Sequence, residues 1–96
     1  MPHYIALIHK DRDSIYGVSF PDIPGVVAAA DTLDAALSEA AEALAFAAED
    51  WETHSEAPFP RPRSLDALHD DPRFVASARA AVVAAVPLAE TVEHPA

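Results

Sequence analysis

Cysteine is absent from the sequence, so disulfides, thiolate zinc sites and thiol nucleophiles are all excluded. Glycine is almost absent, and Gly17 and Gly25 alone cannot build a phosphate-binding loop. No apolar run approaches the length of a transmembrane helix. The start of the chain has neither the basic nor the apolar segment of a secretory signal. We therefore expect a cytoplasmic protein without a membrane segment.

Basic residues are scarce. The chain has six Lys and Arg side chains against 16 Asp and Glu, which gives a formal net charge of −10. No Lys or Arg lies between Arg12 and Arg61, a stretch that holds ten acidic residues. This balance disfavours direct binding to DNA or RNA and favours a basic protein as partner. An acidic run of this kind is most often a solvated helix face, and the residues alone leave both interpretations open.

Large apolar side chains are also limited. Hydrophobic residues occupy 51% of the 96 positions, but 22 residues are Ala. A single small domain with such a composition buries little apolar surface. We therefore expect an oligomer, a dimer or higher, or a partner interface to supplement the core.

Three strands and a turn are predicted in the first third of the chain. Tyr4 to Ile8 is a β-prone apolar run typical of a strand covered on both faces, and Ile15 to Phe20 should pair with it as a hairpin. Pro21 to Gly25 predicts a rigid turn, because its two prolines fix φ and remove backbone donors. Val26 to Ala30 should return to the sheet as a short strand.

A long helix should run from about Leu33 to Trp51, because this segment is rich in Ala, Leu and Glu and lacks Gly and Pro. Asp31 and Thr32 are placed to cap its first turn. Helical spacing predicts a core-facing stripe of Leu33, Leu37, Ala40, Leu44, Ala47 and Trp51. Phe46 projects to the opposite side, among acidic residues. It is either an isolated exposed aromatic or an anchor at a protein interface with an acidic rim.

The second half of the chain reads as linker, short helix and strand. Ala57 to Arg63 is a proline-rich linker. Ser64 to Leu68 predicts one capped helical turn that ends at Asp70-Asp71-Pro72. The Ala- and Val-rich stretch that follows has a split propensity, and we predict a strand over about Arg79 to Val86. Residues 89–96 are expected to form a flexible tail.

No pattern predicts catalysis. The five His residues form no metal-binding pair, and no Ser lies in a Gly-x-Ser-x-Gly context. Asp11 and Asp13 lie in a predicted hairpin turn, where Asp commonly bonds to the backbone. We expect no catalytic residue, no metal site and no cofactor.

The segment from Tyr16 to Ala36 resembles the signature of HicB-type antitoxins, the N-terminal domain of type II HicA/HicB toxin-antitoxin systems. In that family a strand leads into Phe-Pro-Asp-(Leu/Ile)-Pro-Gly, matched here by Phe20 to Gly25. A short strand follows, and an Asp-Thr pair, here Asp31 and Thr32, opens an Ala/Leu/Glu-rich helix. The similarity covers about residues 3–88. One departure is Ala30, where the family has Gly.

The resemblance implies an α+β fold. It would be a partial RNase-H-like domain of order β-β-β-α-(short α)-β, with the helices packed on one face of a small, mostly antiparallel sheet. Residues 1–88 would form this domain. Many members carry a C-terminal DNA-binding element, but only eight residues follow Leu88 and none of them is basic. We therefore do not expect DNA binding or a DNA-binding domain in this chain.

The resemblance also implies a partner. Members neutralise HicA, a small basic ribonuclease toxin with a double-stranded-RNA-binding-like fold, by masking its active site, and they oligomerise. We predict an antitoxin that is not an enzyme and that occludes such a toxin sterically. The candidate contact residues are Asp22, Glu42, Phe46, Glu49 and Asp50. The alternatives are a self-associating scaffold without a toxin partner and, more remotely, a metal-dependent nuclease.

Overall fold

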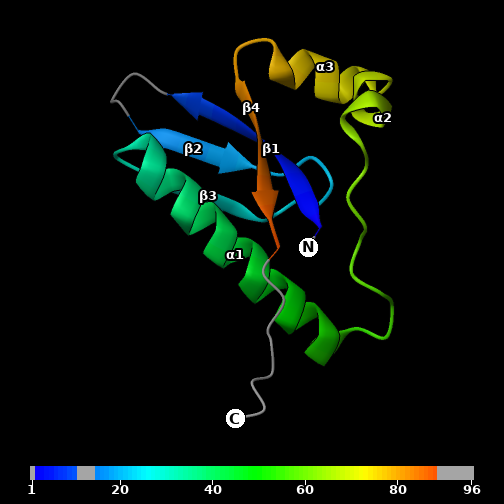
Figure 1. The fold of residues 1–96 in the computed structure, drawn as a ribbon. Coiled ribbons are helices and arrows are strands. Elements are labelled where there is room, and N and C mark those ends of the chain that lie inside the picture. Colours follow the sequence, from blue (N-terminus) through cyan, green and yellow to red (C-terminus); the bar gives the residue numbers. More distant parts are fainter. Residues whose placement is uncertain (1, 11–14, 89–96) are drawn as a thin grey trace.

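The computed structural model describes residues 2–10 and 15–88, which form an α+β fold (Figure 1). The elements are β1 (His3–Lys10), β2 (Tyr16–Ser19), β3 (Val27–Ala30), α1 (Leu33–His54), α2 (Leu65–His69), α3 (Pro72–Ala78) and β4 (Val82–Pro87). The strands form one sheet of order β3-β2-β1-β4, with antiparallel neighbours throughout. The predicted fold class and element order are confirmed. No helix in the described part of the chain is long and apolar enough to cross a membrane.

β1 and β2 form the predicted hairpin, in which Lys10 lies opposite Tyr16 and Leu7 opposite Ser19. The loop that joins them, with Asp11 and Asp13, falls outside the described residues. β4 pairs with the other edge of β1 along six positions, from His3 opposite Pro87 to Ile8 opposite Val82. β1 is therefore a central strand, while β3 and β4 are the two edges of the sheet.

The rigid turn predicted at Pro21 to Gly25 is confirmed. The backbone N–H of Ile23 donates to the Phe20 carbonyl at 3.2 Å, and that of Val26 donates to the Ile23 carbonyl at 3.2 Å. Gly25 has a φ of 96°, in the left-handed region that residues with a Cβ rarely adopt. These bonds reverse the chain so that β3 returns beside β2.

α1 begins at the predicted residue and extends to His54. Its N-cap is Thr32, whose hydroxyl accepts a hydrogen bond from the Ala35 N–H at 3.1 Å. The buried face is narrower than the predicted stripe. Ala36, Ala40 and Leu44 are fully buried, and small side chains suit this contact because the facing strand β3 also presents alanines.

The predicted core position of Leu33 is wrong, because this side chain is 41% exposed. Leu33 lies in the first turn of α1, next to the connection from β3, where the sheet gives it little cover. The buried residue of that first part of the helix is Ala36, one turn further on.

β1 is covered on both faces, as its apolar sequence predicts. Tyr4, Ala6 and Ile8 belong to the core cluster under α1. Leu7 points to the other face, because side chains alternate along a strand. There it joins a smaller cluster with Leu68 of α2 and Phe74 of α3.

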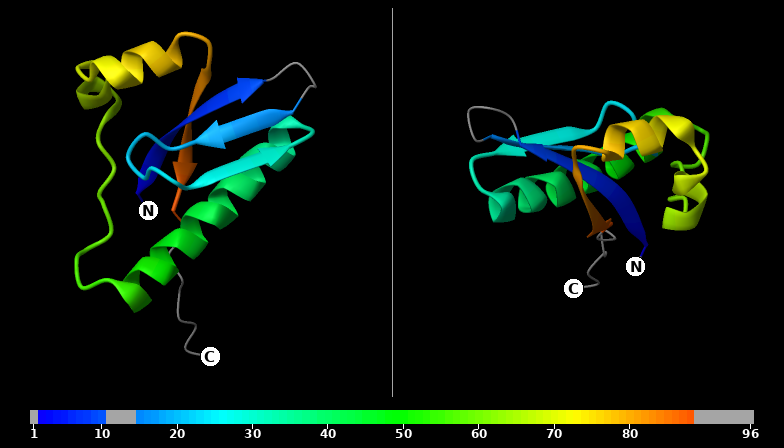
Figure 2. Two further views of the ribbon diagram at one scale, coloured as in Figure 1. Left: turned by 180° about the vertical axis from the view of Figure 1, so that it is seen from behind. Right: turned by 90° about the horizontal axis from the view of Figure 1, so that it is seen from above.

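The expectation that all helices pack on one face of the sheet is therefore wrong. α1 covers one face, and α2 with α3 covers part of the other, where Ile5 and Leu7 would otherwise be exposed to water. Figures 1 and 2 show the two short helices well separated from α1, with the linker running between them.

The short helical turn predicted from Ser64 is confirmed as α2, which ends at His69 with Asp70 as its C-cap, but the sequence did not predict the helix that follows. A further helix, α3, begins there: Asp71 is its N-cap and Pro72 its first residue. Proline is favoured at this position because its missing N–H would have no helical partner. The strand predicted over about Arg79 to Val86 is confirmed as β4. The predicted tail, residues 89–96, lies outside the described residues.

Candidate functional site

Four of the five predicted contact residues lie together on α1. Glu42, Phe46, Glu49 and Asp50 are one and two turns apart, so their side chains follow one another along a single side of the helix. All four are exposed. Phe46 is the most unusual, because 71% of its surface is in contact with solvent. We call this set the acidic stripe.

A shallow hollow of about 290 Å³ lies beside Phe46, where the start of β3 and the turn before it meet α1. Its lining residues are Gly25, Val26, Val27, Ala43, Phe46, Ala47 and Asp50. Val27 is 65% exposed, so it adds a second large apolar side chain to the surface of this β3–α1 hollow. The hollow thus combines apolar walls with the neighbouring carboxylate of Asp50.

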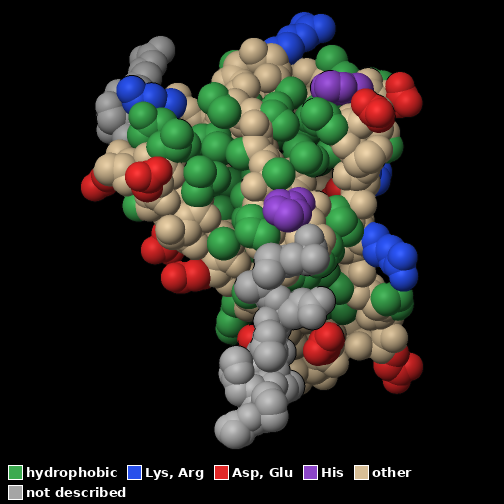
Figure 3. All heavy atoms as spheres, in the orientation of Figure 1, with side chains coloured by type: hydrophobic (Ala, Val, Ile, Leu, Met, Phe, Trp, Pro, Cys, Tyr) green, Lys and Arg blue, Asp and Glu red, His purple; other side chains and the backbone are tan. Residues whose placement is uncertain are grey.

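The charge on α1 is of one sign. The helix holds six Asp and Glu residues and no Lys or Arg. Asp50 forms an ion pair with His54 at 3.1 Å, but the two side chains are 56% and 68% exposed, so this pair contributes little to stability. Figure 3 shows acidic side chains along the outer margin of α1, with the basic side chains of this view elsewhere. The stripe therefore presents negative charge to solvent.

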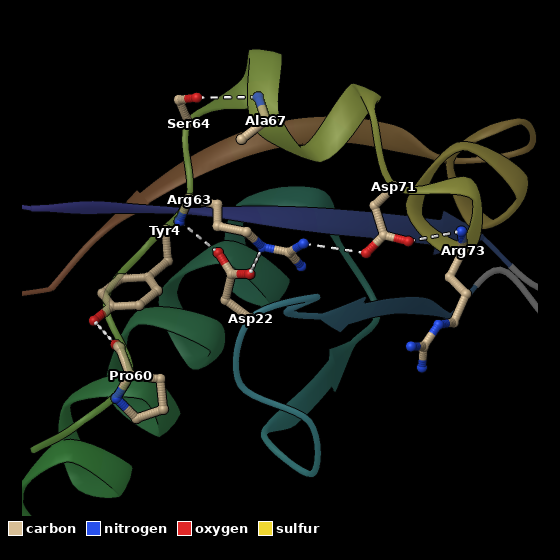
Figure 4. A network of polar contacts seen from close by, with 8 residues as sticks. All are labelled: Tyr4, Asp22, Pro60, Arg63, Ser64, Ala67, Asp71 and Arg73. Carbon is tan, nitrogen blue, oxygen red and sulfur yellow. Dashed lines mark hydrogen bonds and ion pairs between the residues drawn. The ribbon is translucent and has the colours of Figure 1, made fainter.

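Asp22, the fifth predicted contact residue, lies apart from the acidic stripe. Its carboxylate is only 7% exposed and pairs with Arg63 of the linker. The Arg63 Nε donates to Oδ1 at 2.6 Å, and the Arg63 backbone N–H donates to Oδ2 at 2.7 Å (Figure 4). Both oxygens are thus used within the chain, and they fasten the linker to the turn.

Arg63 also joins this turn to α3. Its Nη1 donates to the Asp71 carboxylate at 3.1 Å (Figure 4). The pKa of Asp71 is lowered, first by the backbone N–H of Arg73 and then by the Arg63 side chain. The pKa of Arg63 is raised, with the hydrogen bond to Asp22 as the largest cause. We call Asp22, Arg63 and Asp71 the linker clamp.

Aromatic side chains hold the rest of the linker. Phe59 makes edge-to-face contacts with Tyr4 of β1 and Trp51 of α1, at ring-centroid distances of 6.0 and 5.7 Å. The Tyr4 hydroxyl donates to the Pro60 carbonyl at 2.7 Å, and the Trp51 Nε1–H donates to the Ala57 carbonyl at 2.8 Å. Burial, and then the charge of Asp22, raises the pKa of Tyr4. The proline-rich linker is thus bound along the side of the domain.

Sequence reasoning missed several of these residues. Asp22 and Arg63 are 41 positions apart, and no local pattern connects them. Val27 reads only as a strand residue, although its exposure at the edge of the sheet makes it part of the hollow. The Asp71-Pro72 pair did carry a signal, since Asp followed by Pro is typical of a helix start. Within residues 2–10 and 15–88, no three His, Asp or Glu side chains lie close enough together to hold a metal ion.

Comparison with known proteins gives one family match and several similar solved structures. Residues 4–94 match the family described as "HicB_like antitoxin of bacterial toxin-antitoxin system". The crystal structure of the Burkholderia pseudomallei antitoxin HicB is similar, with 32% identity, a TM-score of 0.73 and 91% of this chain covered. The structure of the N-terminal domain of that antitoxin is also similar, with 31% identity, a TM-score of 0.73 and 91% coverage.

A third similar structure is a HicA3 and HicB3 toxin-antitoxin complex, with 27% identity and a TM-score of 0.68 over 88% of this chain. The chain spans 63% of the length of the Burkholderia pseudomallei antitoxin HicB, 98% of its N-terminal domain and 95% of the matched chain in the complex. The comparison with curated proteins gives no match.

Proposed function

The chain belongs to the HicB_like antitoxin family of bacterial toxin-antitoxin systems, and from that premise we propose that it binds and inhibits a small basic HicA-type toxin that cleaves mRNA. The inhibition is steric: the antitoxin covers the catalytic surface of the toxin and performs no chemistry itself. Both proteins act in the cytoplasm, where mRNA is the substrate. The similarity to a HicA3 and HicB3 complex supports a toxin of this class as the partner.

The observation that carries the proposal is the acidic stripe with Phe46 at its centre. A toxin that binds RNA needs a basic surface for the phosphates. Carboxylates of Glu42, Glu49 and Asp50 match such a surface in sign, and they stand in for the phosphates when the complex forms. The antitoxin then occupies the place of the RNA.

The apolar part of the stripe supplies affinity. Aromatic side chains that become buried at the centre of an interface are common hot spots. Phe46 is 71% exposed in the free chain, and the β3–α1 hollow beside it accepts an apolar side chain of the toxin. Burial of Phe46 contributes about 2 kcal/mol or more, while the surrounding carboxylates mainly orient and accelerate association.

The test is to purify the chain with the product of a neighbouring small reading frame that encodes a basic protein, and to measure RNA cleavage with and without the chain. We expect a stable complex and suppressed cleavage. Phe46→Ala should weaken the complex by about 30-fold, the equivalent of about 2 kcal/mol. The melting temperature of the free chain should hardly change.

A matched control is Val75→Ala, which removes an apolar side chain that is 37% exposed on α3, away from the stripe. This variant should bind the toxin like the wild type. A strong complex with Phe46→Ala, or equal weakening in both variants, would show that the acidic stripe is not part of the toxin interface. Absence of any complex would favour the alternative of a self-associating scaffold.

The β4 edge supports self-association, and we propose that a second copy of the chain pairs with it. The strand Val82–Pro87 contains no charged residue, and Val82 and Val83 are 61% and 39% exposed. Edge strands without charges or bulges are prone to pair with another strand. Because this edge is neutral, it is where two copies of a chain with net charge −10 can approach.

Light scattering tests this interface. We expect the wild type to be a dimer or larger, and Val82→Lys with Ala85→Lys to give a monomer, because charged side chains on an edge strand oppose its pairing with another strand. Thr53→Lys on exposed α1 is a control for the added charge. A monomeric wild type would contradict the proposed pairing. A monomeric variant that still inhibits the toxin would show that inhibition does not require self-association of the chain.

A further inference from the structure

A second and larger hollow lies on the opposite face of the sheet and has no part in the proposed toxin contact. It measures about 420 Å³ and lies between β1, the end of β2 and α3. Its apolar lining includes Leu7, Phe20 and Phe74, each 3% exposed and so at its floor. Its polar lining is His9, Ser19, Arg63, Asp71, Arg73 and Ser77. We call it the β1–α3 hollow.

Hydrogen-bond donors dominate the polar lining. Arg63 and Arg73 each carry a guanidinium, and Ser19 and Ser77 carry hydroxyls. The one carboxylate, that of Asp71, already accepts hydrogen bonds from Arg63 Nη1 at 3.1 Å and from the Arg73 N–H at 2.9 Å. A ligand in this hollow therefore meets many donors and few available acceptors, which favours an anion rich in acceptor oxygens.

His9 adds an imidazole ring to the same lining. Its Nε2 lies 3.1 Å from the Ser77 carbonyl, and because a carbonyl only accepts, Nε2 must carry the hydrogen. The ring nitrogen Nε2 is therefore used within the chain, and the imidazole forms part of the wall of the hollow.

Arg73 is the best-placed ligand group. Its side chain forms no ion pair with any residue of the described part of the chain, and Figure 4 shows its guanidinium pointing away from the Asp71 carboxylate. Guanidinium groups bind phosphate oxygens in a bidentate manner. In a protein of net charge −10, an exposed guanidinium at a concave surface is a feature that general solubility does not require.

We propose that the β1–α3 hollow is a binding site for a small phosphorylated ligand of mononucleotide size. The phosphate lies against Arg73 and the available N–H groups of Arg63, while the ring system of the ligand covers the apolar floor formed by Leu7, Phe20 and Phe74. The volume lies within the range of small-molecule pockets. This site is independent of the toxin contact, which lies on the other side of the sheet.

The experiment titrates the full chain with adenosine 5′-monophosphate and follows backbone amide shifts by NMR and binding heat by calorimetry. We expect shifts at His9, Ser19 and Ser77. Arg73→Gln should weaken binding about tenfold or more, the factor that follows from losing a hydrogen bond to a charged group. Arg79→Gln, just beyond the end of α3 and outside the hollow, is the matched control and should bind like the wild type.

Two further probes identify which part of the ligand is recognised. Adenosine without phosphate should bind much more weakly than the monophosphate, and inorganic phosphate should bind more weakly than the monophosphate but also lose affinity in Arg73→Gln. Inorganic phosphate that binds as well as the monophosphate would overturn the assignment of a nucleotide-sized ligand. No shifts with either phosphate probe, or equal losses in Arg73→Gln and Arg79→Gln, would overturn the site. Thermal melting of both variants checks that they fold.

Discussion

On one face of the sheet a single long helix closes a cluster of ten buried residues, whereas on the other face two short helices close a cluster of three. The charges differ as well. On the second face Asp22, Arg63 and Asp71 are joined in the linker clamp, while on the first face the outer side of α1 carries acidic groups and no Lys or Arg.

This difference separates charges that serve folding from charges available for binding. The large apolar cluster under α1 holds the helix by burial, and the acidic residues on the outer side of α1 remain exposed. The small cluster under α2 and α3 buries little apolar surface, and the linker clamp adds directional bonds there. Three predictions test this division, in order of decreasing effect.

The largest effect on stability is expected from truncating a buried leucine in each of the two apolar clusters. Leu44 and Leu68 are both fully buried, and replacing either by Ala should cost about 2–5 kcal/mol of unfolding free energy. Leu44→Ala should cost more, because it leaves a cavity inside the larger cluster, whereas the short helix that carries Leu68 can move to fill the space. Urea denaturation of the two variants measures both values. A greater loss of unfolding free energy for Leu68→Ala than for Leu44→Ala would show that the smaller cluster contributes more to stability than the larger one.

A smaller effect is expected from opening the linker clamp. Asp22→Ala removes the acceptor for the Arg63 backbone N–H and for its guanidinium, and should cost about 1–3 kcal/mol. Asp66→Ala on α2, an exposed carboxylate outside the clamp, should change stability much less. Toxin affinity should be unchanged in both variants. Weaker toxin binding by Asp22→Ala with unchanged stability would instead make Asp22 a contact residue.

The smallest effect is a change in acid sensitivity. The pKa of Asp71 is lowered in the folded chain, so its carboxylate contributes stability above its unfolded pKa, and this contribution is lost as the pH falls through the folded pKa. In Asp71→Asn the helix cap remains but this titration is gone. Melting temperatures should therefore decline less steeply on acidification than in the wild type. Parallel declines would show that the clamp charge does not stabilise the second face.

Much of the fold could be predicted because its signals are local. The double-proline turn ending in Gly25, the cap at Thr32 and the apolar run of β1 each act within a few residues. Where prediction failed, the deciding contact was distant. Leu33 continues the periodicity of α1 but lies where the sheet gives little cover, and α3 packs through Phe74 against Leu7 of the distant strand β1.

The part of the candidate site that depends on local helical spacing could also be predicted from the sequence. Helical geometry alone puts Glu42, Phe46, Glu49 and Asp50 on one side of α1, because their spacing matches the helical repeat. It does not reveal the hollow beside Phe46, which depends on how β3 packs against the helix. The sequence predicts Asp22 as a contact residue at the rigid turn, because nothing local shows that its carboxylate is bound by Arg63, which is 41 positions away in the sequence.

The sequence by itself determined the order of the elements, the excess of acid on α1 and the motif shared with the HicB_like antitoxin family, since all of these depend on residue type and short spacing. Only the tertiary structure decided that α2 and α3 cover the second face, that Asp22 is used within the chain, and that two hollows form on different sides of the sheet. These outcomes depend on which distant segments meet. That is set by the packing of the whole chain, because a side chain's exposure and hydrogen-bond partners come from its neighbours in space.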